Sequence, residues 1–411
     1  MASTDNMALV KTGEVVDYYY YDRNNLQKTA FKTIQNNRFT SAFQTLSQGT
    51  NTIIVSPLDG ITDVMAVFQL PTQSYTGLAL NRGWGYGLIK NVSIRYGGST
   101  MVQMTGKQIL LQNMYQACSK EQKDLVYSAG GAECLTAGAF AGDNMYAYCY
   151  ISLPHSSLSA DETKPLPCPT DLLTSPVVIT IEINPLSSIF SVQGGTAPTQ
   201  LAKAYAQIQQ VLFQDKGDRL ASRAVIKDKI YSYPVSYFQQ EYTTNISGNT
   251  STPIPINLTG FRSGECKSII LWLTKPTDET GATKNINRVY LPRNLTLSWN
   301  GETLFQSEGT ASILFNLANE KSTPVFDGSV VSWTGSAFTS LPTNQVYAVV
   351  PFAQFSDAVF GSHVHVSGLA VQNAVVNLSL TTPDTDAYVL HAVYLYNSSL
   401  LFSNGNAEFV F

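Results

Sequence analysis

The stretch "GWGYGLIKNVSIRYGGSTMVQMTGKQILL", residues 83–111, combines a cluster of glycines with an alternating apolar pattern. A dinucleotide-binding loop has the spacing G-x-G-x-x-G and lies between a strand and a helix. Here Leu88 occupies the third glycine position, and Val92, Ile94 and Tyr96 then alternate with polar residues. That period of two predicts a half-buried strand, with no helix N-terminus after the glycines to bind a phosphate. The stretch therefore indicates a β protein and not a nucleotide site.

Strand patterns of this kind recur along the chain. Residues 175–185, "SPVVITIEINP", place four apolar residues on one face: Val177, Ile179, Ile181 and Ile183. Residues 386–397, "DAYVLHAVYLYN", are apolar on both faces, as in a sandwich interior. Further candidates are residues 266–276, 344–352 and 373–383. Turn dipeptides lie between apolar runs at Asn300-Gly301, Asn404-Gly405, Asp59-Gly60 and Asp327-Gly328. Many short strands separated by such turns predict a β-sandwich or barrel.

Few helices are expected. Residues 198–213, "PTQLAKAYAQIQQVLF", place Leu201, Tyr205, Ile208 and Leu212 on one helical face and predict a packing helix. Its polar face carries only Lys203, too little charge for a membrane-surface helix. Residues 106–116 predict a second, shorter helix. The most polar stretch follows the first one, so we expect a boundary between two β domains at residues 215–223.

The composition agrees with two domains and with extensive burial. A chain of 411 residues exceeds one ordinary core, and only 13% of it is charged, whereas 44% is hydrophobic, with 22 Tyr and 19 Phe. Tyrosine suits interfaces because it joins a large apolar ring to a polar tip. We therefore expect other copies of the chain to cover much of the surface. The tract "DYYYYDRNN", residues 17–25, is either such an interface or an edge strand within its own domain.

Charge and targeting signals exclude several classes. The net charge is −4, and the nearest approach to a basic cluster, "RVYLPR" at residues 288–293, is sparse, so we expect no direct binding of a genome. The sequence has neither a signal-peptide core at its start nor an apolar run long enough to span a membrane. Five cysteines without a C-x-x-C pair predict reduced, buried thiols in a chain folded in the cytosol: Cys118, Cys134, Cys149, Cys168 and Cys266. Seven N-x-S/T sequons are read as chance products of an Asn-, Ser- and Thr-rich β protein: Asn91, Asn245, Asn249, Asn257, Asn294, Asn377 and Asn397.

Candidates for chemistry are few. His363 and His365 would point to the same face of a strand, but two imidazoles alone make a weak metal site. The other histidines are His155 and His391. Scattered carboxylates such as Asp63, Glu182 and Asp215 form no evident pair, and no nucleophile motif is present. The sequence thus predicts no catalytic residue, no metal ligand and no cofactor, and the chain is not expected to be an enzyme.

The opening stretch resembles the first-domain signature of double jelly-roll major capsid proteins from nucleocytoplasmic large DNA viruses and related eukaryotic dsDNA viruses. In that family a strand of the form G-x-x-L-I-K-x-V-x-L-x-I-G-G precedes a G-x-x-L segment. The matching residues are Gly85, Leu88, Ile89, Lys90, Val92, Ile94, Gly97, Gly98, Gly106 and Leu110. Upstream, residues 51–71 resemble the strand, turn and strand that come before this signature.

The second half resembles the same family. Residues 256–275 are similar to the strand that opens the second jelly roll, and residues 349–380 to the family's FA…SG run. That run matches through Phe352, Ala353, Ser367 and Gly368, whereas its Asn-x-Ser-Arg element is replaced around residues 369–372. The closing segment, residues 394–411, matches through Tyr396, Asn397, Leu400, Gly405, Ala407 and Phe411.

The resemblance implies an all-β fold of two tandem eight-stranded jelly-roll β-sandwiches with a few short helices. We expect an N-terminal arm over residues 1–30, a first jelly roll over 31–214 and a second over 215–411. Residues 243–257, rich in Ser, Thr and Asn, are expected to form an outer loop of the second jelly roll.

The function implied is structural. Three copies of a capsid subunit would form a pseudo-hexagonal homotrimer, and these capsomers would tile an icosahedral virion shell made from chains synthesised in the host cytosol. The partners implied are neighbouring copies and minor capsid or cement proteins, with any contact to an inner membrane made only through minor proteins. The competing interpretation is a carbohydrate-binding β-sandwich attachment protein that stacks exposed aromatic residues on sugars.

Overall fold

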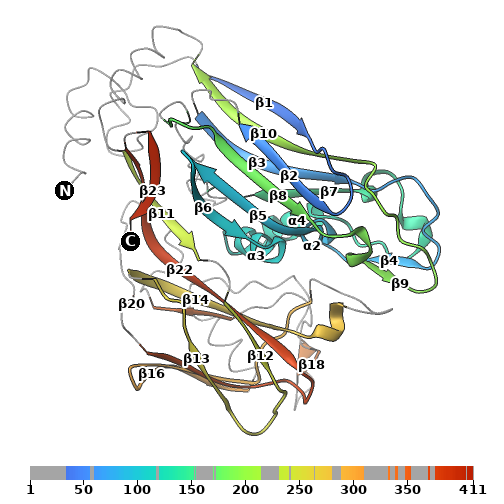
Figure 1. Ribbon diagram of the computed structural model, residues 1–411. Coiled ribbons are helices and arrows are strands. Elements are labelled where there is room, and N and C mark those ends of the chain that lie inside the picture. Colours follow the sequence, from blue (N-terminus) through green and yellow to red (C-terminus); the bar gives the residue numbers. More distant parts are fainter. Residues whose placement is uncertain are drawn as a thin grey trace.

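The computed structural model describes residues 34–55, 60–116, 120–151, 153, 170, 173–213, 231–239, 242–262, 264–279, 288–309, 332–333, 338–340, 348–352, 369–370, 375–403 and 405–410. These residues form two β-sandwiches that lie side by side (Figure 1). Several features of the sequence lie outside the described residues: the arm 1–30 with its tyrosine tract, the boundary 215–223, the turn Asp327-Gly328, and His155, His363 and His365.

The first sandwich consists of two four-stranded antiparallel sheets. Sheet I has the order β1-β10-β3-β7, with bounds β1 (Ile34–Ala42), β3 (Gly60–Gln69), β7 (Tyr146–Ile151) and β10 (Lys203–Phe213). Sheet II has the order β2-β8-β5-β6, with bounds β2 (Gly49–Val55), β5 (Ile89–Tyr96), β6 (Ser99–Met104) and β8 (Val177–Ile183). A small separate pair joins β4 (Leu78–Leu80) to β9 (Phe190–Val192).

The second sandwich has the same construction. Sheet III has the order β11-β22-β14-β19, with bounds β11 (Tyr231–Phe238), β14 (Glu265–Thr274), β19 (Ala348–Pro351) and β22 (Tyr388–Ser403). Three shorter strands extend it: β12 (Tyr242–Ile246), β20 (Leu369–Ala370) and β23 (Asn406–Val410). Sheet IV has the order β13-β21-β15-β16, with bounds β13 (Ile254–Leu258), β15 (Asn294–Trp299), β16 (Glu302–Glu308) and β21 (Val376–Thr381). A separate pair joins β17 (Ser332–Trp333) to β18 (Phe338–Ser340).

The two sandwiches have identical topology. When the eight principal strands of each are counted in chain order, the sheets of both have the orders 1-8-3-6 and 2-7-4-5. Successive strands therefore alternate between the facing sheets, except for the fourth and fifth, which form a hairpin within one sheet, and this order defines a jelly roll. This confirms the prediction of two tandem eight-stranded jelly rolls.

The predicted strand patterns correspond to buried faces. In β8 all four predicted apolar residues are at most 1% exposed: Val177, Ile179, Ile181 and Ile183. Val92, Ile94 and Tyr96 of β5 are likewise buried. The dipeptide Asn300-Gly301 joins β15 to β16 with φ values of 47° and 88°, as a type I′ hairpin requires. Gly405, at the turn predicted between two apolar runs, lies between β22 and β23 with a φ of 76°. These predictions are confirmed.

The prediction of a helix over residues 198–213 is wrong, because Lys203–Phe213 is strand β10. Its buried residues Ala204, Ala206, Ile208 and Gln210 alternate with a period of two. The strand lies between β1 and β3 and pairs with both, so the sheet determines its conformation against the local helical spacing.

The predicted helix at residues 106–116 is confirmed as α3 (Gly106–Gln116). Two helices were not predicted: α2 (Trp84–Leu88) within the glycine-rich stretch, and α4 (Lys120–Ala129). In the part of the chain that the structure describes, the other helical segments are short 3₁₀ turns: η2 (Ala137–Ala139), η3 (Gly142–Met145), η5 (Leu186–Ser188) and η6 (Pro276–Glu279). Among the described residues, no helix has the length and apolar character needed to cross a membrane.

The outer loop expected at residues 243–257 is shorter than predicted. Thr243–Ile246 belongs to β12 and Ile254–Asn257 to β13, so only residues 247–253 connect the two strands. Among the described strands each pairs on one side only, β12 with β22 and β13 with β21. The polar composition that suggested a loop therefore reflects edge strands with outward-facing Ser, Thr and Asn.

Candidate functional site

Sheet III has an apolar surface on both faces, and this determines how the two jelly rolls are joined. One face of β14 places Ile269, Leu271 and Leu273 in the interior of the second jelly roll. The opposite face places Ile270 and Trp272 in a core that is continuous with that of the first jelly roll. β22 divides in the same way: Ala392, Tyr394 and Tyr396 on the first side, and Val393, Leu395, Leu400 and Phe402 on the other. We call the contact between sheet III and the first jelly roll the seam.

Specific contacts cross the seam. The ring of Phe402 meets that of Tyr96 edge-on, with centroids 6.4 Å apart. The Gly405 carbonyl accepts a 2.9 Å hydrogen bond from the Thr174 amide. In α3, the Gln108 side-chain amide donates to the Gln239 carbonyl at 2.9 Å. β6 lies beside β23, and α3 lies between the two sandwiches (Figure 1). The seam therefore fixes the two jelly rolls as one unit.

Two glycines of the opening stretch, Gly85 and Gly106, allow close packing next to the seam. A Cβ atom at Gly85 would lie 2.5 Å from the Ala147 Cβ on β7, and one at Gly106 would overlap the Tyr86 carbonyl oxygen. Only glycine allows α2 to pack this closely against β7 and the start of α3. Both glycines are motif positions of the capsid-protein resemblance, and the close contacts around them give each a steric role in this chain.

The described histidine and cysteines lie in structural positions, whereas His155, His363, His365, Cys118 and Cys168 lie outside the described residues. His391 Nε2 is 2.7 Å from Thr274 Oγ1, and the ring stacks on Trp272 with centroids 5.2 Å apart. Burial raises the pKa of Cys134 to about 11 and that of Cys266 to about 12. Burial also raises the pKa of the Cys149 thiol. These three cysteines are buried and free, as predicted, and they remain thiols at neutral pH.

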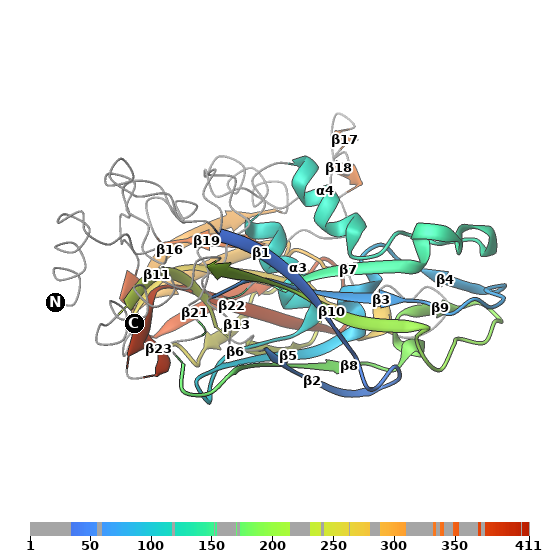
Figure 2. The same cartoon turned by 90° about the horizontal axis from the view of Figure 1, so that it is seen from above.

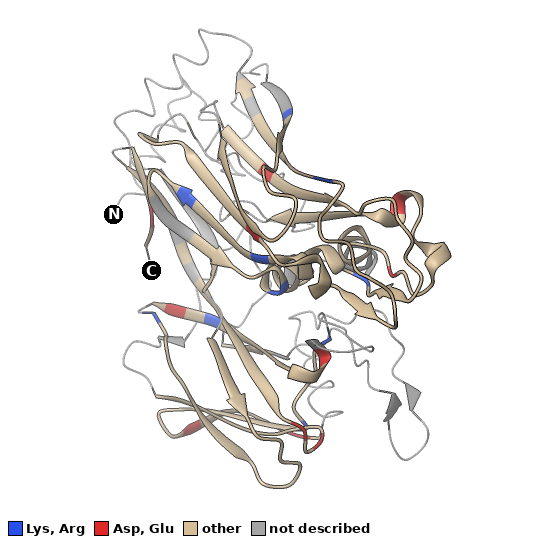
Figure 3. Cartoon of the chain, turned by 45° about the vertical axis from the view of Figure 1, so that its right-hand side comes forward, with Lys and Arg blue, Asp and Glu red and all other residues tan. Residues whose placement is uncertain are grey.

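The two described candidate carboxylates, Asp63 and Glu182, are not brought together, and Asp215 lies outside the described residues. Asp63 accepts a 2.6 Å hydrogen bond from the Tyr150 hydroxyl on sheet I, whereas Glu182 pairs with Lys90 at 2.6 Å on sheet II. Within the described ranges, no group of three or more His, Cys, Asp or Glu residues is placed to hold a metal ion. Lys and Arg are scattered over the described chain and form no continuous basic stripe (Figure 3).

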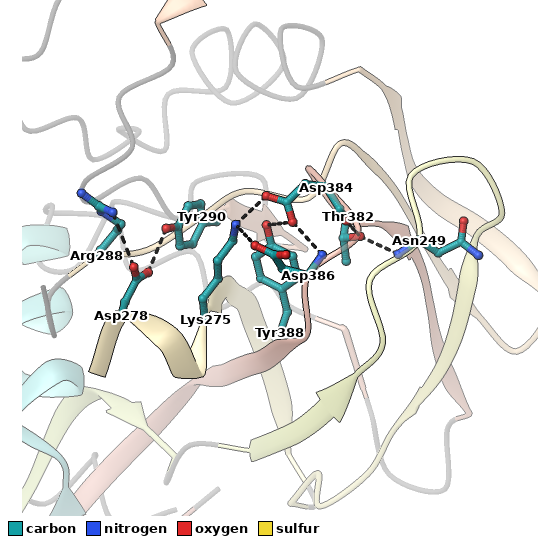
Figure 4. Close-up of polar contacts among 9 residues, drawn as sticks. All are labelled: Asn249, Lys275, Asp278, Arg288, Tyr290, Thr382, Asp384, Asp386 and Tyr388. Atoms are coloured by element: carbon teal, nitrogen blue, oxygen red, sulfur yellow. Dashed lines mark hydrogen bonds and ion pairs between the residues drawn. The ribbon is translucent and has the colours of Figure 1, made fainter. Parts of the chain in front are cut away.

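A polar cluster that the sequence analysis missed lies at one end of the second jelly roll (Figure 4). Lys275 Nζ, just after β14, lies 2.5 Å from Asp384 Oδ2 and 2.8 Å from Asp386 Oδ2 in the β21–β22 turn. The same ammonium lies 5.1 Å from the Tyr290 ring centroid and 5.2 Å from that of Tyr388. Two carboxylates and two aromatic rings therefore surround one positive charge.

The Lys275 cluster extends to neighbouring loops. The Tyr290 hydroxyl donates to Asp278 Oδ2 at 2.8 Å, and Arg288 approaches Asp278 Oδ1 at 3.4 Å. On the other side, the Asn249 amide donates to Thr382 Oγ1 at 2.7 Å (Figure 4). The cluster thus ties the η6 turn, the β21–β22 turn and the β12–β13 connection together.

The charges of the cluster stabilise one another. Burial opposes the charge on Lys275, but hydrogen bonds with Asp384, Asp386 and Tyr388 outweigh it and raise the lysine's pKa. Burial likewise opposes the charge on Asp384, but hydrogen bonds from Lys275, from the Asp386 amide and from Tyr388 outweigh it and lower the pKa of that carboxyl. Both groups therefore stay ionised at neutral pH. Such ion pairs stabilise the packing of neighbouring loops and do not transfer protons.

A groove of about 500 Å³ lies between the edge strands β12 and β13. Its lining is mostly polar and includes Tyr242, Asn245, Asn249 and Asn257. The groove is formed by residues 242–257, the segment that the sequence analysis singled out as an outer loop.

Two matched jelly rolls joined through a shared sheet define the double jelly-roll class, and solved viral capsid proteins have this fold over nearly their whole length. VP54 of PBCV-1, fitted into a reconstruction of the virophage Sputnik, is 12% identical at a TM-score of 0.65, over 93% of this chain and 98% of that one. The Faustovirus major capsid protein is 9% identical at a TM-score of 0.57, over 91% and 92% of the two chains. The mavirus major capsid protein is 12% identical at a TM-score of 0.50, over 96% and 94%. No protein-family model and no curated protein matches the sequence. This chain has the double jelly-roll fold of viral major capsid proteins.

Proposed function

We propose that this chain is a major capsid protein whose homotrimers form pseudo-hexagonal capsomers that tile an icosahedral virion shell. The observation that carries the proposal is the pair of jelly rolls with identical strand order, fixed side by side by the seam. Three such chains would present six similar sandwiches around one axis, and a unit with six similar edges can tile a surface. The role is structural and requires no enzymatic activity.

The domain division proposed is an arm at residues 1–30 and jelly rolls at 31–214 and 215–411. The partners proposed are neighbouring copies and minor capsid or cement proteins. No sequence-specific contact with nucleic acid is proposed, because the charges are sparse and scattered (Figure 3). Contact with an inner membrane would be made only through minor proteins. The chain would be synthesised in the host cytosol and located in the virion shell.

Sedimentation tests this proposal directly. Purified protein should sediment at three times the chain mass of 44.8 kDa, or as larger shells, and electron microscopy should show particles with hexagonal outlines. A species that stays at the mass of a single chain at the highest attainable concentration would contradict the proposal.

The groove between β12 and β13 favours a second candidate function, that of a carbohydrate-binding attachment protein. Asn side chains and an aromatic ring are groups that bind sugars, and Tyr242, Asn245, Asn249 and Asn257 all line it. Screening against a glycan array, with Tyr242→Ala as the comparison, separates the two candidates. Binding that disappears in Y242A, from a protein that sediments as a monomer, would favour attachment.

A further inference from the structure

Sheet I has a tyrosine-rich outer face, turned away from sheet II. On this face Tyr205 and Tyr148 lie on either side of Val67, which is fully buried although it faces outward. Tyr146 stacks on Tyr148 with ring centroids 6.1 Å apart. We call this surface the tyrosine face, and its described residues are Arg38, Thr40, Asp63, Met65, Val67, Gln69, Tyr146, Tyr148, Tyr150, Lys203, Tyr205, Gln207 and Gln209.

The outer faces of sheets II and IV have a different chemistry. The register and burial of sheet II place Thr50, Thr52, Ile54, Lys90, Ser93, Arg95, Gln103, Val178, Thr180 and Glu182 outward. Sheet IV places Pro255, Asn257, Thr296, Ser298, Thr303, Gln306, Asn377 and Ser379 outward. None of these described outward residues is aromatic, as expected of faces in contact with water. The tyrosine face is therefore the outer face with the composition of a protein interface.

Topology indicates what covers the tyrosine face. Sheet III has the same strand order as sheet I, 1-8-3-6, and its outer face is covered by the first jelly roll of the same chain. Part of that cover is the β5–β6 hairpin, whose two-residue turn places Gly97 against the Gly405 carbonyl at the end of sheet III. The equivalent element of the second jelly roll is the β15–β16 hairpin, which also has a two-residue turn with two positive φ values.

The β15–β16 hairpin has the surface of a docking element. Leu304 is 41% exposed, and Val375, which exchanges hydrogen bonds with Asn300 at the turn, is 50% exposed. β16 is an edge strand that exposes Glu302 and Glu308 and contains no Lys or Arg. The tyrosine face exposes Arg38 and Lys203, and its acidic residue Asp63 is partly buried and accepts a hydrogen bond from Tyr150. The charges of the two surfaces are therefore complementary.

We propose that the tyrosine face of one copy binds the β15–β16 side of the second jelly roll of another copy. This inference rests on the proposed trimer and names its contact surfaces: each intermolecular contact repeats the arrangement of the seam within a chain. The contact is heterologous, and with the three-fold rotation of the proposed trimer it closes a ring of six jelly rolls.

Two single substitutions and a mixture test this arrangement. Tyr148→Glu removes an aromatic anchor from the tyrosine face, and Leu304→Glu adds repulsion on the hairpin, so each alone should raise the concentration for half-dissociation of the trimer by at least about tenfold. Thr52→Glu, which places the same charge on the outer face of sheet II, is the matched control and should leave the trimer intact. Thermal unfolding and near-UV circular dichroism verify that all three variants are folded.

Mixing the two interface variants gives the sharper result. Y148E keeps an intact hairpin and L304E keeps an intact tyrosine face, so native mass spectrometry should detect a one-to-one dimer in the mixture that neither variant forms alone. Trimers that persist in both variants, trimers lost equally in T52E, or the absence of the mixed dimer would overturn the inference and leave the proposed function standing. A monomeric wild-type protein would instead overturn the proposed function itself.

Discussion

Replacing Phe402 with alanine should separate the unfolding of the two jelly rolls. Phe402 is 2% exposed and contacts Tyr96 across the seam, so the substitution removes a buried ring from the surface that joins the sandwiches. Phenylalanine-to-alanine changes in cores cost about 3–5 kcal/mol, and an aromatic pair accounts for about 0.5–1.5 kcal/mol of such a cost. Since domain stabilities are about 5–15 kcal/mol, this loss is large enough to uncouple the two units.

Differential scanning calorimetry measures this effect. The wild-type chain should unfold in one transition, and Phe402→Ala in two, with the lower midpoint reduced by about 6 °C or more. The matched control is Phe68→Ala, because Phe68 is fully buried in the first jelly roll and belongs to β3 rather than to sheet III. Phe68→Ala should lower the midpoint without splitting the transition. The reasoning fails if Phe402→Ala still unfolds in one transition with a loss below about 1 kcal/mol.

Three further predictions follow from single sites. Lys275→Met should lower the free energy of unfolding at pH 7 by about 1 kcal/mol, a value reduced by the 46% and 61% exposure of Asp384 and Asp386, with Lys90→Met as the surface control. Because the Asp384 pKa is lowered, its contribution is present above its ordinary value of 3.8 and is lost as the pH falls through the lower folded-state value. The free energies of unfolding of K275M and wild type, measured by urea titration, should therefore converge as the pH falls below 3.8, and a constant difference would contradict this. Gly106→Ala should cost about 1–3 kcal/mol or prevent soluble expression, whereas Gly138→Ala, with open space around its Cβ position, should be neutral; equal unfolding midpoints for the two would refute the steric role. Peptide mapping after iodoacetamide treatment should find Cys134, Cys149 and Cys266 unmodified in the native state and modified in urea, and rapid native labelling would show that their burial is not maintained in solution.

The strands could be predicted wherever one face is apolar. The alternation in β5 and β8 arises because each strand separates a core from solvent, and a period of two records that difference directly. The turn at Asn300-Gly301 was predictable because few residue pairs tolerate two positive φ values. β10 was not predictable in this way, since its small and polar residues fit a helical face equally well and only pairing with β1 and β3 decides between the two conformations.

The site features depended on contacts between residues distant in the sequence. Asp384, Asp386 and Tyr388 alternate within one short segment and could have indicated a polar turn before a strand. Their partner Lys275 lies 109 residues from Asp384, and no local pattern connects the two. The seam left a clearer signal, because β14 and β22 are apolar on both faces. That pattern predicted a sandwich interior, whereas the physical reason is that sheet III is shared by two cores.

The seam also changes what the composition implies. The low fraction of charged residues and the many aromatic residues suggested that other copies cover the surface. Several large aromatic side chains are instead buried within the chain's own cores, each at most 1% exposed: Tyr86, Tyr96, Tyr394, Tyr396 and Trp272. Composition therefore cannot separate burial within a chain from burial between chains, because both require apolar surface. The tyrosine face separates them, since Tyr148 remains 37% exposed on a sheet whose topological equivalent packs against the first jelly roll. The case for self-association accordingly depends on this difference between two equivalent sheets, and not on the overall content of tyrosine.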